Sequence, residues 1–436
     1  MSTQPSTGFL GAWAQLIGPT TLPVVPRRRG RKPRVPLTDL LPALTFHVMQ
    51  SAGTLSDHLF ELCGVRLADS SWSDRRARLP WEIFADVMRR ALRPRATRRQ
   101  REAFWRGWRL VALDGTQFSL TNTPQITATV EKAKTRRGRA AFAKITTTVL
   151  LELGLHNPLA AGIGRHGESE WALALRLLAQ LPKDALLLGD RWYGCGAFAV
   201  HAAAACAAVG SHFVLRARGS IKPRRVTRLA DGSRVIRVGV RAPRNPTRIV
   251  AWLEVREIRV RVGRPGHRSH ELRLWTTLVD PETAPALELV QLYAQRWEHE
   301  LYFRELKRQL RKTDVLQSHT IETAAQEIAA LVLASAVLAT ERARAAPSGV
   351  PVLRVRFGHV LNIVRGMWLL LGPFDDLMTD HLRDQIVRRG RALMGRCLTA
   401  RRRSRTAPRA IRQPTKKWPR LLHAESVEGP FAFHLV

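Results

Sequence analysis

The stretch at residues 287–310, LELVQLYAQRWEHELYFRELKRQL, constrains the fold of this chain more than any other. It contains helix-forming residues throughout, without Pro or Gly, and two prolines lie just ahead of it, so it predicts one long helix. Each residue turns about 100° around a helix axis, and five side chains then fall within an arc of roughly 80°: Tyr293, Arg296, Glu300, Arg304 and Lys307. One carboxylate therefore shares a stripe with a phenol and three cations.

Two interpretations of this stripe are open. Glu298 and Glu305 lie roughly 140–160° from Glu300 around the axis, so its acidic neighbours do not share its face. A solvated surface helix could use these charges for salt bridges at spacings of three and four residues. Alternatively, Glu300 is a catalytic carboxylate set in a phosphate-binding stripe, and this interpretation requires further carboxylates elsewhere in the chain.

Two other acidic residues follow buried strand patterns. WRLVALDGTQFSL predicts a strand that ends at Asp114, and ALLLGDRWYG predicts a second strand that ends at Asp190. A carboxylate at the end of a buried strand can hold a metal ligand on a rigid element, although Asp-Gly is also an ordinary turn dipeptide. We expect the core to bring Asp114, Asp190 and Glu300 together.

Three carboxylates around one point repel each other unless cations are present. Mg²⁺ prefers oxygen ligands and binds through a few carboxylates together with substrate phosphate oxygens. Two such ions about 4 Å apart clamp the attacking and leaving oxygens of a phosphoryl displacement. The cationic stripe beside Glu300 would then seat the phosphates next to the bond that breaks.

The charge balance favours nucleic acid as the partner. The chain has 71 Lys and Arg against 35 Asp and Glu, a net charge of +36, and guanidinium groups suit bidentate phosphate contacts.

No apolar run approaches the roughly 18 residues that span a membrane, and residues 328–339 predict a buried helix. The N-terminus lacks a secretory signal pattern. The four cysteines form no C-x-x-C pair, so we expect reduced thiols in the cytoplasm.

Composition and periodicity divide the chain into five parts. The predicted order is a basic flexible arm, a helical DNA-binding domain, a catalytic core in two pieces, a β-rich insertion between those pieces, and a C-terminal helical region with a basic tail: 1–36, 37–104, 105–216 with 281–345, 217–280, and 346–436. Within the second part, a helix at 54–62, a Gly-containing turn and a Ser/Arg-rich helix at 68–79 resemble a helix-turn-helix. Such layouts also arise by chance in helical bundles.

The insertion alternates basic and β-branched residues, and an Asp-Gly pair within it predicts a hairpin. We expect a small antiparallel sheet with one strongly basic face. Trp252 and Trp275 could stack on an unpaired base or could be core residues of this sheet.

The spacing Tyr293, two residues, Arg296, three residues, Glu300, six residues, Lys307 matches the late signature of the DDE transposases of the insertion sequence 4 family. LDGT around Asp114 resembles the first acidic motif of that family. GDRWYG around Asp190 resembles the second, in which an aromatic residue, here Tyr193, follows closely. The resemblance covers roughly residues 40–420.

The resemblance implies a fold and a chemistry. The fold is α/β, with a ribonuclease-H-like mixed sheet flanked by helices, an inserted antiparallel β domain and an N-terminal helical DNA-binding domain. Asp114, Asp190 and Glu300 would be the catalytic residues and would bind two Mg²⁺ ions, which Mn²⁺ could replace. DNA would be contacted by the remaining residues of the stripe: Tyr293, Arg296, Arg304 and Lys307.

The implied reaction is cleavage at transposon ends followed by attack of the freed 3′-hydroxyl on target DNA. The partners would be double-stranded terminal inverted repeats and target DNA, with a homodimer in the synaptic complex, in the bacterial cytoplasm and associated with the nucleoid. A non-catalytic sequence-specific DNA-binding protein and an inactive transposase relic are the alternatives. A tyrosine recombinase is disfavoured, because the chain has three tyrosines and none lies after Tyr302.

Overall fold

The computed structural model describes residues 40–400 and 432–435, except positions 51, 136–137, 220, 222, 243–244, 264–269, 312 and 375–376. The predicted basic arm and nearly all of the basic tail lie outside the described residues. The chain forms two compact units. The first comprises the residues up to Phe104 together with Asp114–Gln180 and Glu298–Ala400, and the second comprises Trp105–Leu113, Leu181–Trp297 and the residues after Ala400.

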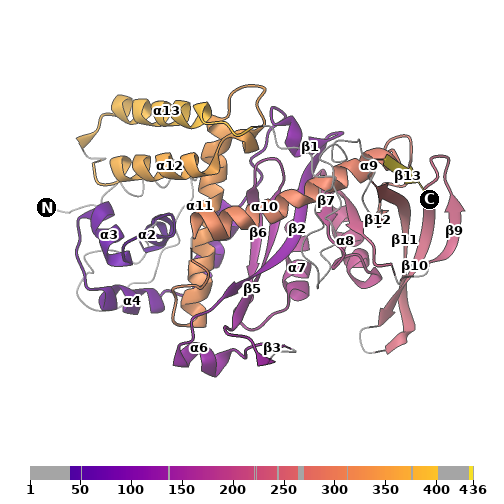
Figure 1. The fold of residues 1–436 in the computed structure, drawn as a ribbon, viewed down its shortest axis with the longest axis horizontal. Coiled ribbons are helices and arrows are strands. Elements are labelled where there is room, and N and C mark those ends of the chain that lie inside the picture. The colour runs from indigo at the N-terminus through magenta and orange to yellow at the C-terminus, as the bar shows by residue number, and fades with distance from the viewer. Residues whose placement is uncertain are drawn as a thin grey trace, which may run out of the picture. The chain divides into compact units, whose positions relative to one another are not determined.

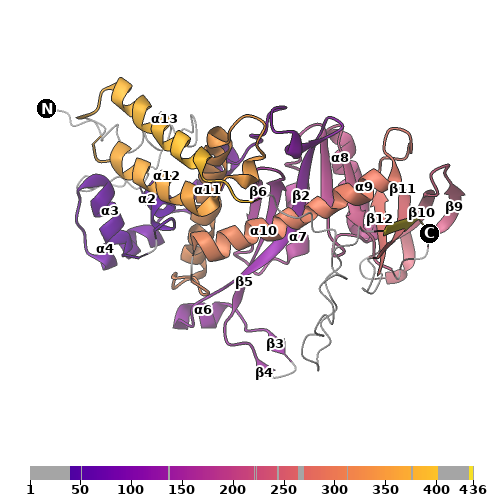
Figure 2. The same ribbon diagram turned by 45° about the horizontal axis from the view of Figure 1, so that its top comes forward.

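The helix α11 (Ile321–Ala345) is the centre of the first unit, and nearly all of its side chains are buried. It contacts strand β6 and most of the other helices of this unit, as Figure 1 shows. Those helices are α2 (Leu40–His47), α4 (Asp69–Ala77), α5 (Trp81–Ala91), α12 (Phe357–Leu371) and α13 (Asp380–Arg396). Helices α12 and α13 lie side by side in both views (Figures 1 and 2). The prediction of a buried helix at residues 328–339 is confirmed, and the helix extends beyond this stretch at both ends.

The burial of α11 accounts for its apolar composition. Among the described helices, this one is long and apolar enough to cross a membrane by length and composition, although no uninterrupted apolar run of that size exists. Inside the protein, 94% of its most apolar window is buried. Its apolar surface is therefore covered by the core of the first unit.

The predicted helix-turn-helix elements are present as α3 (Leu55–Cys63) and α4, with Gly64 in the left-handed conformation between them. Arg76 of α4 does not face outward. Its guanidinium donates to the side chain oxygens of Gln326 (3.1 Å) and Ser318 (2.9 Å), close to α11. Arg76 therefore anchors α4 to the core, whereas the serines of α4 are exposed. A groove-reading role for α4 stays a prediction.

Each unit contributes part of the main sheet, and strand β2 (Trp108–Ser119) runs through both. In the first unit the strand order is β6-β5-β2, with β5 (Lys144–Glu152) and β6 (Asn157–Ile163) paired antiparallel. Helix α7 (Glu170–Leu178) packs on β5 and β6. Short elements complete this unit: η2 (Arg101–Ala103), α6 (Pro124–Thr129), β3 (Lys134–Thr135), β4 (Gly138–Arg139) and η5 (Val352–Arg354).

In the second unit β2 pairs in parallel with β7 (Ala185–Gly189), which pairs in parallel with β8 (His212–Arg216). Helix α8 (Gly196–Ala208) packs on β8. Across the sheet these five strands lie in the order β6-β5-β2-β7-β8. If they are numbered by their order along the chain, the order across the sheet is 3-2-1-4-5. This order, with a hairpin of the second and third strands and parallel fourth and fifth strands, is ribonuclease-H-like, so the predicted fold class is confirmed.

The insertion extends the sheet of the second unit beyond β8, in the order β12-β11-β10-β9. Its strands are β9 (Arg224–Arg228), β10 (Arg234–Ala242), β11 (Asn245–Gly263) and β12 (His270–Thr276), and β13 (Ala432–Leu435) pairs with β11. The predicted Asp-Gly hairpin joins β9 to β10. Some of the basic residues are structural: Arg256 is fully buried and donates to the Asp231 carboxylate and the Ala284 carbonyl.

The stretch at 287–310 is not one regular helix. It contains α9 (Ala286–Tyr293), a 3₁₀ turn η3 (Ala294–Arg296), α10 (Trp297–Arg304) and a π-helical turn η4 (Glu305–Leu310). The prediction of a continuous α-helix was therefore wrong in detail. Propensities of single residues do not report the tertiary contacts that hold a π turn.

Candidate active site

The first two candidate carboxylates each follow the last paired residue of a strand. The register of the parallel pair β2–β7 ends with Leu113 opposite Gly189, and the next residue along each chain segment is an aspartate, Asp114 and Asp190. Strand β7 ends at this point as predicted, whereas β2 continues to Ser119, so Asp114 lies within a strand and not at its end. Both aspartates are partly exposed.

Backbone N–H groups orient both carboxylates. Asp114 Oδ1 accepts from the N–H of Gly115 at 2.9 Å, and Asp190 Oδ1 accepts from the N–H of Trp192 at 2.7 Å. A charge-assisted bond of this kind restricts the rotation of a carboxylate. The two side chains are therefore fixed by local backbone geometry.

In the second unit, Tyr293 ties the end of α9 to the residue before Asp190. The Tyr293 hydroxyl donates to the Gly189 carbonyl at 3.1 Å, and the side chain is 8% exposed. Burial raises the pKa of Tyr293 because the phenolate would lose hydration, while the positive charges of Arg296 and Arg216 oppose this shift. Tyr293 is therefore a neutral hydrogen-bond donor beside the Asp190 segment.

In the first unit, contacts on two sides hold the segment that carries Glu300. On one side, the Glu298 carboxylate accepts from the N–H of Gly154, in the turn between β5 and β6, at 2.7 Å. On the other side, Lys307 Nζ donates to the Gln117 carbonyl of β2 at 2.7 Å. Gln117 is three residues beyond Asp114, so this contact joins the elements of two candidate site residues. Glu300 is partly exposed, and Arg304 is exposed.

Lys307 lies in a basic patch. Its ammonium is 5.0 Å from the centre of the Phe118 ring, and the Arg311 guanidinium is 5.5 Å from the same ring. Burial, together with the nearby charges of Arg311, Lys144 and Arg308, lowers the pKa of Lys307 to about 8. A cation that is destabilised in this way is stabilised when an anion binds next to it.

Sequence reasoning missed a contact beside Asp114. A Cβ atom on Gly115 would lie 2.2 Å from the Glu170 carboxyl carbon, so only glycine fits at this position without a shift of Glu170. Glu170 is in the first turn of α7, where an acidic residue is expected for helix stability alone. The glycine of the LDGT motif therefore leaves space for a side chain of another element.

Three tryptophans of the second unit differ in exposure. Trp275 is fully buried, so it is a core residue, whereas Trp252 is 36% exposed between the guanidinium groups of Arg224 and Arg237. Trp252 lines a hollow of about 490 Å³ in the insertion. Trp192, two residues after Asp190, is 52% exposed and was not singled out from the sequence. Both partly exposed rings are contacted by guanidinium groups, Trp252 by Arg224 and Arg237 and Trp192 by Arg218.

The donor chemistry of the three carboxylates fits a divalent cation, because each offers hard oxygen ligands on a partly exposed side chain. Asp114 and Glu300 belong to the first unit and Asp190 belongs to the second. In the part of the chain that the structure describes, no group of three His, Cys, Asp or Glu side chains is close enough to share a metal ion. The meeting of all three carboxylates therefore stays a prediction.

A ribonuclease-H-like strand order, with an aspartate directly after the last paired residue of each of two parallel strands, is typical of metal-dependent enzymes that transfer phosphoryl groups of nucleic acids. Residues 105–337, more than half of the chain, match the family described as the transposase DDE domain. The chain belongs to this family and is a DDE transposase of the IS4 type. It binds DNA and catalyses DNA cleavage and strand transfer, and it depends on a divalent metal.

The chain is similar to two curated transposases. The chain is 25% identical over 322 residues to the transposase InsG for insertion sequence element IS4 of Escherichia coli K12, covering 72% of this chain and 70% of that one. It is 28% identical over 128 residues to the putative transposase InsZ of the same organism, covering 29% and 43%. The piggyBac transposase synaptic complex with hairpin DNA aligns with 8% identity and a TM-score of 0.38 over 89% of this chain and 82% of that one.

Proposed function

We propose that Asp114, Asp190 and Glu300 together bind two Mg²⁺ ions, which Mn²⁺ can replace. The observation that supports this most is the register of β2 and β7, in which the last pair, Leu113 and Gly189, is followed on each strand by an aspartate. The link between Lys307 and Gln117 supports the addition of Glu300, because it joins the Glu300 segment to the strand of Asp114. The bound metals would activate the attacking oxygen and stabilise the leaving oxygen.

The remaining residues of the signature would place DNA for this reaction. Arg296, Arg304 and Lys307 would pair with phosphates at the transposon end, since each is at least partly exposed and cationic. Tyr293 would join this phosphate contact, and its bond to the Gly189 carbonyl also positions the segment of Asp190. The chain's own residues thus hold the phosphodiester and orient the carboxylates, first for hydrolytic nicking and then for attack of the 3′-hydroxyl on target DNA.

The substrates would be the terminal inverted repeats of the element and a target duplex. The exposed serines of α4 and the basic surface of the insertion support separate contacts with the repeat. We propose that a homodimer pairs two ends in the synaptic complex, in the cytoplasm and on the nucleoid. Sedimentation of the protein with end DNA tests the stoichiometry, and a complex of one protein with one end under catalytic conditions would contradict the dimer.

The test of this proposal is a cleavage assay on linear DNA that carries the element's own ends. We expect nicking and strand transfer with Mg²⁺ or Mn²⁺ and neither product with EDTA, because the carboxylates alone cannot stabilise the leaving oxygen. DNA of the same length without the repeats is the matched control. Cleavage that persists in EDTA would exclude the metal mechanism.

The lowered pKa of Lys307 predicts proton uptake when end DNA binds. The pKa of Lys307 in the folded protein is about 8, against an ordinary value of 10.5 for lysine. The protonated lysine therefore destabilises the free fold below pH 8, and this penalty is relieved as the pH rises through 8. A phosphate next to the ammonium raises the pKa again, so binding at pH 8 should take up about half a proton, and affinity should fall as the pH rises further.

Calorimetry in buffers of different ionisation enthalpy measures this uptake. Lys307→Arg is the matched control, because arginine stays charged over the whole pH range and should remove the uptake while retaining most of the affinity. Equal uptake in the wild type and in Lys307→Arg would show that Lys307 does not meet a phosphate.

A further inference from the structure

The π turn η4 follows directly after the helix that carries Glu300. The N–H of Arg311 donates to the Leu306 carbonyl, five residues earlier, at 3.1 Å. A bond over five residues instead of four shifts the following side chains around the helix axis. Single π turns of this kind occur frequently at functional sites. Because Lys307 lies inside η4, the point at which the turn begins decides where its ammonium points.

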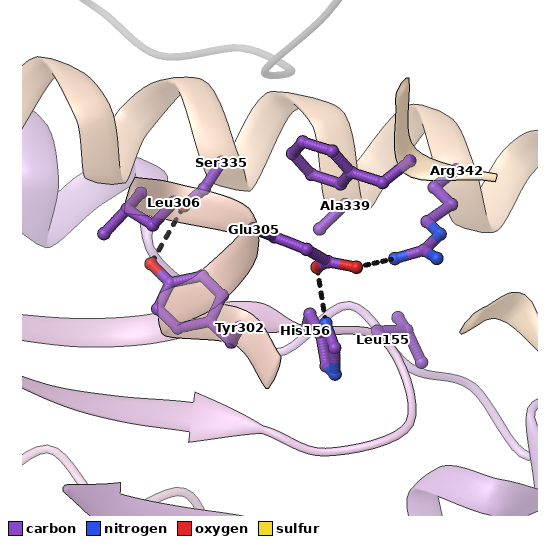
Figure 3. Close-up of a pocket in the computed structure, with 9 residues that line it drawn as sticks. Leu155, His156, Tyr302, Glu305, Leu306, Ser335, Ala339 and Arg342 are labelled. Carbon is purple, nitrogen blue, oxygen red and sulfur yellow. Dashed lines mark hydrogen bonds and ion pairs between the residues drawn. The ribbon is translucent and has the colours of Figure 1, made fainter. Parts of the chain in front are cut away.

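Glu305, the first residue of η4, is held on both sides by buried partners. Its carboxylate lies 2.6 Å from His156 Nδ1 and 3.3 Å from Arg342 Nη1, as Figure 3 shows. The three residues are 2–3% exposed. His156 has a positive φ of 56° in the turn between β5 and β6, and Arg342 belongs to α11. The β5–β6 turn, η4 and α11 therefore meet at one carboxylate.

Arg342 is itself fixed by the backbone. Its Nε donates to the Val355 carbonyl at 2.8 Å and its Nη2 to the Leu353 carbonyl at 2.9 Å. The carboxylate of Glu305 thus meets a guanidinium that cannot follow it if η4 shifts. Ion pairs that are this deeply buried contribute little net stability but constrain geometry.

The cluster is not a ligand site. The cavity beside it, lined by Tyr302, Leu306 and Ser335 among others, has a volume of about 10 Å³, which is at most enough for one water molecule. The Tyr302 hydroxyl and the Ser335 Oγ, 3.0 Å apart, form a second link between α10 and α11 at this cavity. The other link to α11 is the Glu305–Arg342 pair. Only this pair includes a residue at the junction between the α-helix and the π turn, because η4 begins at Glu305.

We propose that Glu305 is a positioning residue of the transposase reaction. Its pairing with His156 and Arg342 fixes the point at which α10 changes into the π turn, and so holds Lys307 at the Gln117 carbonyl while Glu300 stays in α10. A helix that continued as α-helix past Glu305 would rotate Lys307 away from β2. The inference rests on the proposed roles of Glu300 and Lys307.

Glu305→Gln tests the inference, because the amide keeps the shape of the side chain but leaves Arg342 without a countercharge. We expect single-turnover end cleavage at saturating DNA to fall about 100-fold, since a displacement of about 1 Å has effects of this size. In the same variant, NMR titration of ¹³C,¹⁵N-labelled lysines should show the pKa of Lys307 rising from about 8 towards 10.5.

Tyr302→Phe is the matched control. It removes a buried hydrogen bond at the same cavity and should lower the melting temperature, yet it should leave the Lys307 titration unchanged and cleavage within about threefold, because the π turn is not touched. If Glu305→Gln yields too little folded protein, His156→Leu, which retains the pair of Glu305 with Arg342, should show both effects in a weaker form.

Wild-type cleavage and an unchanged Lys307 titration in Glu305→Gln would overturn the positioning role. An equal loss of cleavage in Tyr302→Phe would also overturn it, because general destabilisation would then explain the effect. The proposed function fails separately: cleavage by Glu300→Gln would exclude it whatever the Glu305 variants do. An inactive Glu300→Gln with a normal Glu305→Gln would remove only the positioning role.

Discussion

Glu300→Gln is expected to lower single-turnover cleavage at transposon ends by about 1,000-fold or more, with end binding nearly unchanged. The amide has the size of the carboxylate but lacks the negative charge that holds a divalent cation. Glu300 is partly exposed in α10, so the fold should tolerate the change. The measurement is the rate of strand cleavage at saturating protein with Mg²⁺, together with the affinity for end DNA.

Glu322→Gln is the matched control for this loss of charge. Glu322 lies in the first turn of α11 and forms an exposed ion pair with Arg165, and surface pairs of this kind contribute little stability. Its cleavage rate should equal that of the wild type. A Glu300→Gln rate within tenfold of the wild type would refute the catalytic assignment.

Asp114→Asn and Asp190→Asn should each match the loss of Glu300→Gln. Residues that act as one unit give effects that do not add, so a double variant should lose little more than either single variant. Losses that multiplied in the double variant would indicate that the carboxylates act at separate places.

Regular elements could be predicted where hydrophobic periodicity was strong. The helix α11 and the hairpin at Asp231-Gly232 each carry their own local signal: a long apolar stretch and a turn dipeptide. Local patterns determine such elements because their stabilising contacts repeat at fixed intervals along the chain.

Interruptions of these elements could not be predicted, because their causes lie far away in sequence. The π turn begins where Glu305 meets His156, 149 residues earlier, and Arg342, 37 residues later. Arg76 belongs to the Ser/Arg-rich helix of the predicted helix-turn-helix, yet its partners Gln326 and Ser318 are 250 and 242 residues away in sequence. No local pattern separates an arginine that faces solvent from one that binds a distant carbonyl or amide.

The candidate site was predicted from spacing and not from geometry. The register of β2 and β7 ends at Leu113 and Gly189, one residue before each aspartate, and the repeated pattern of apolar strand and aspartate had suggested this pairing of strands. Trp252 and Trp275 both lie in strands of the insertion. Only the packing shows that the Trp275 side chain is fully buried while Trp252 is 36% exposed. The function of a tryptophan in a strand therefore depends on which face of the sheet is covered.

Gly194→Ala is expected to lower the free energy of unfolding by about 3 kcal/mol, the upper range for an overpacked site. Gly194 lies between β7 and α8, four residues after Asp190. A Cβ atom there would be 1.7 Å from the carbonyl oxygen of Arg216 and 2.9 Å from Cα of Ala217. Both contacts are with backbone, so no side-chain rotation can relieve them, and the Asp190 segment or the end of β8 must move.

This movement should also reduce end cleavage per folded molecule by about 100-fold, because a shift of about 1 Å in the segment of Asp190 disturbs the alignment of its carboxylate. Gly219→Ala is the matched control: a Cβ atom on Gly219 meets no described heavy atom within 4 Å, and its stability should stay within about 0.5 kcal/mol of the wild type. Denaturant unfolding and single-turnover cleavage measure the two effects. Reduced stability with normal cleavage would show that Gly194 serves the packing of β8 alone, whereas equal stability of the two variants would contradict the close approach of the Asp190 segment to β8.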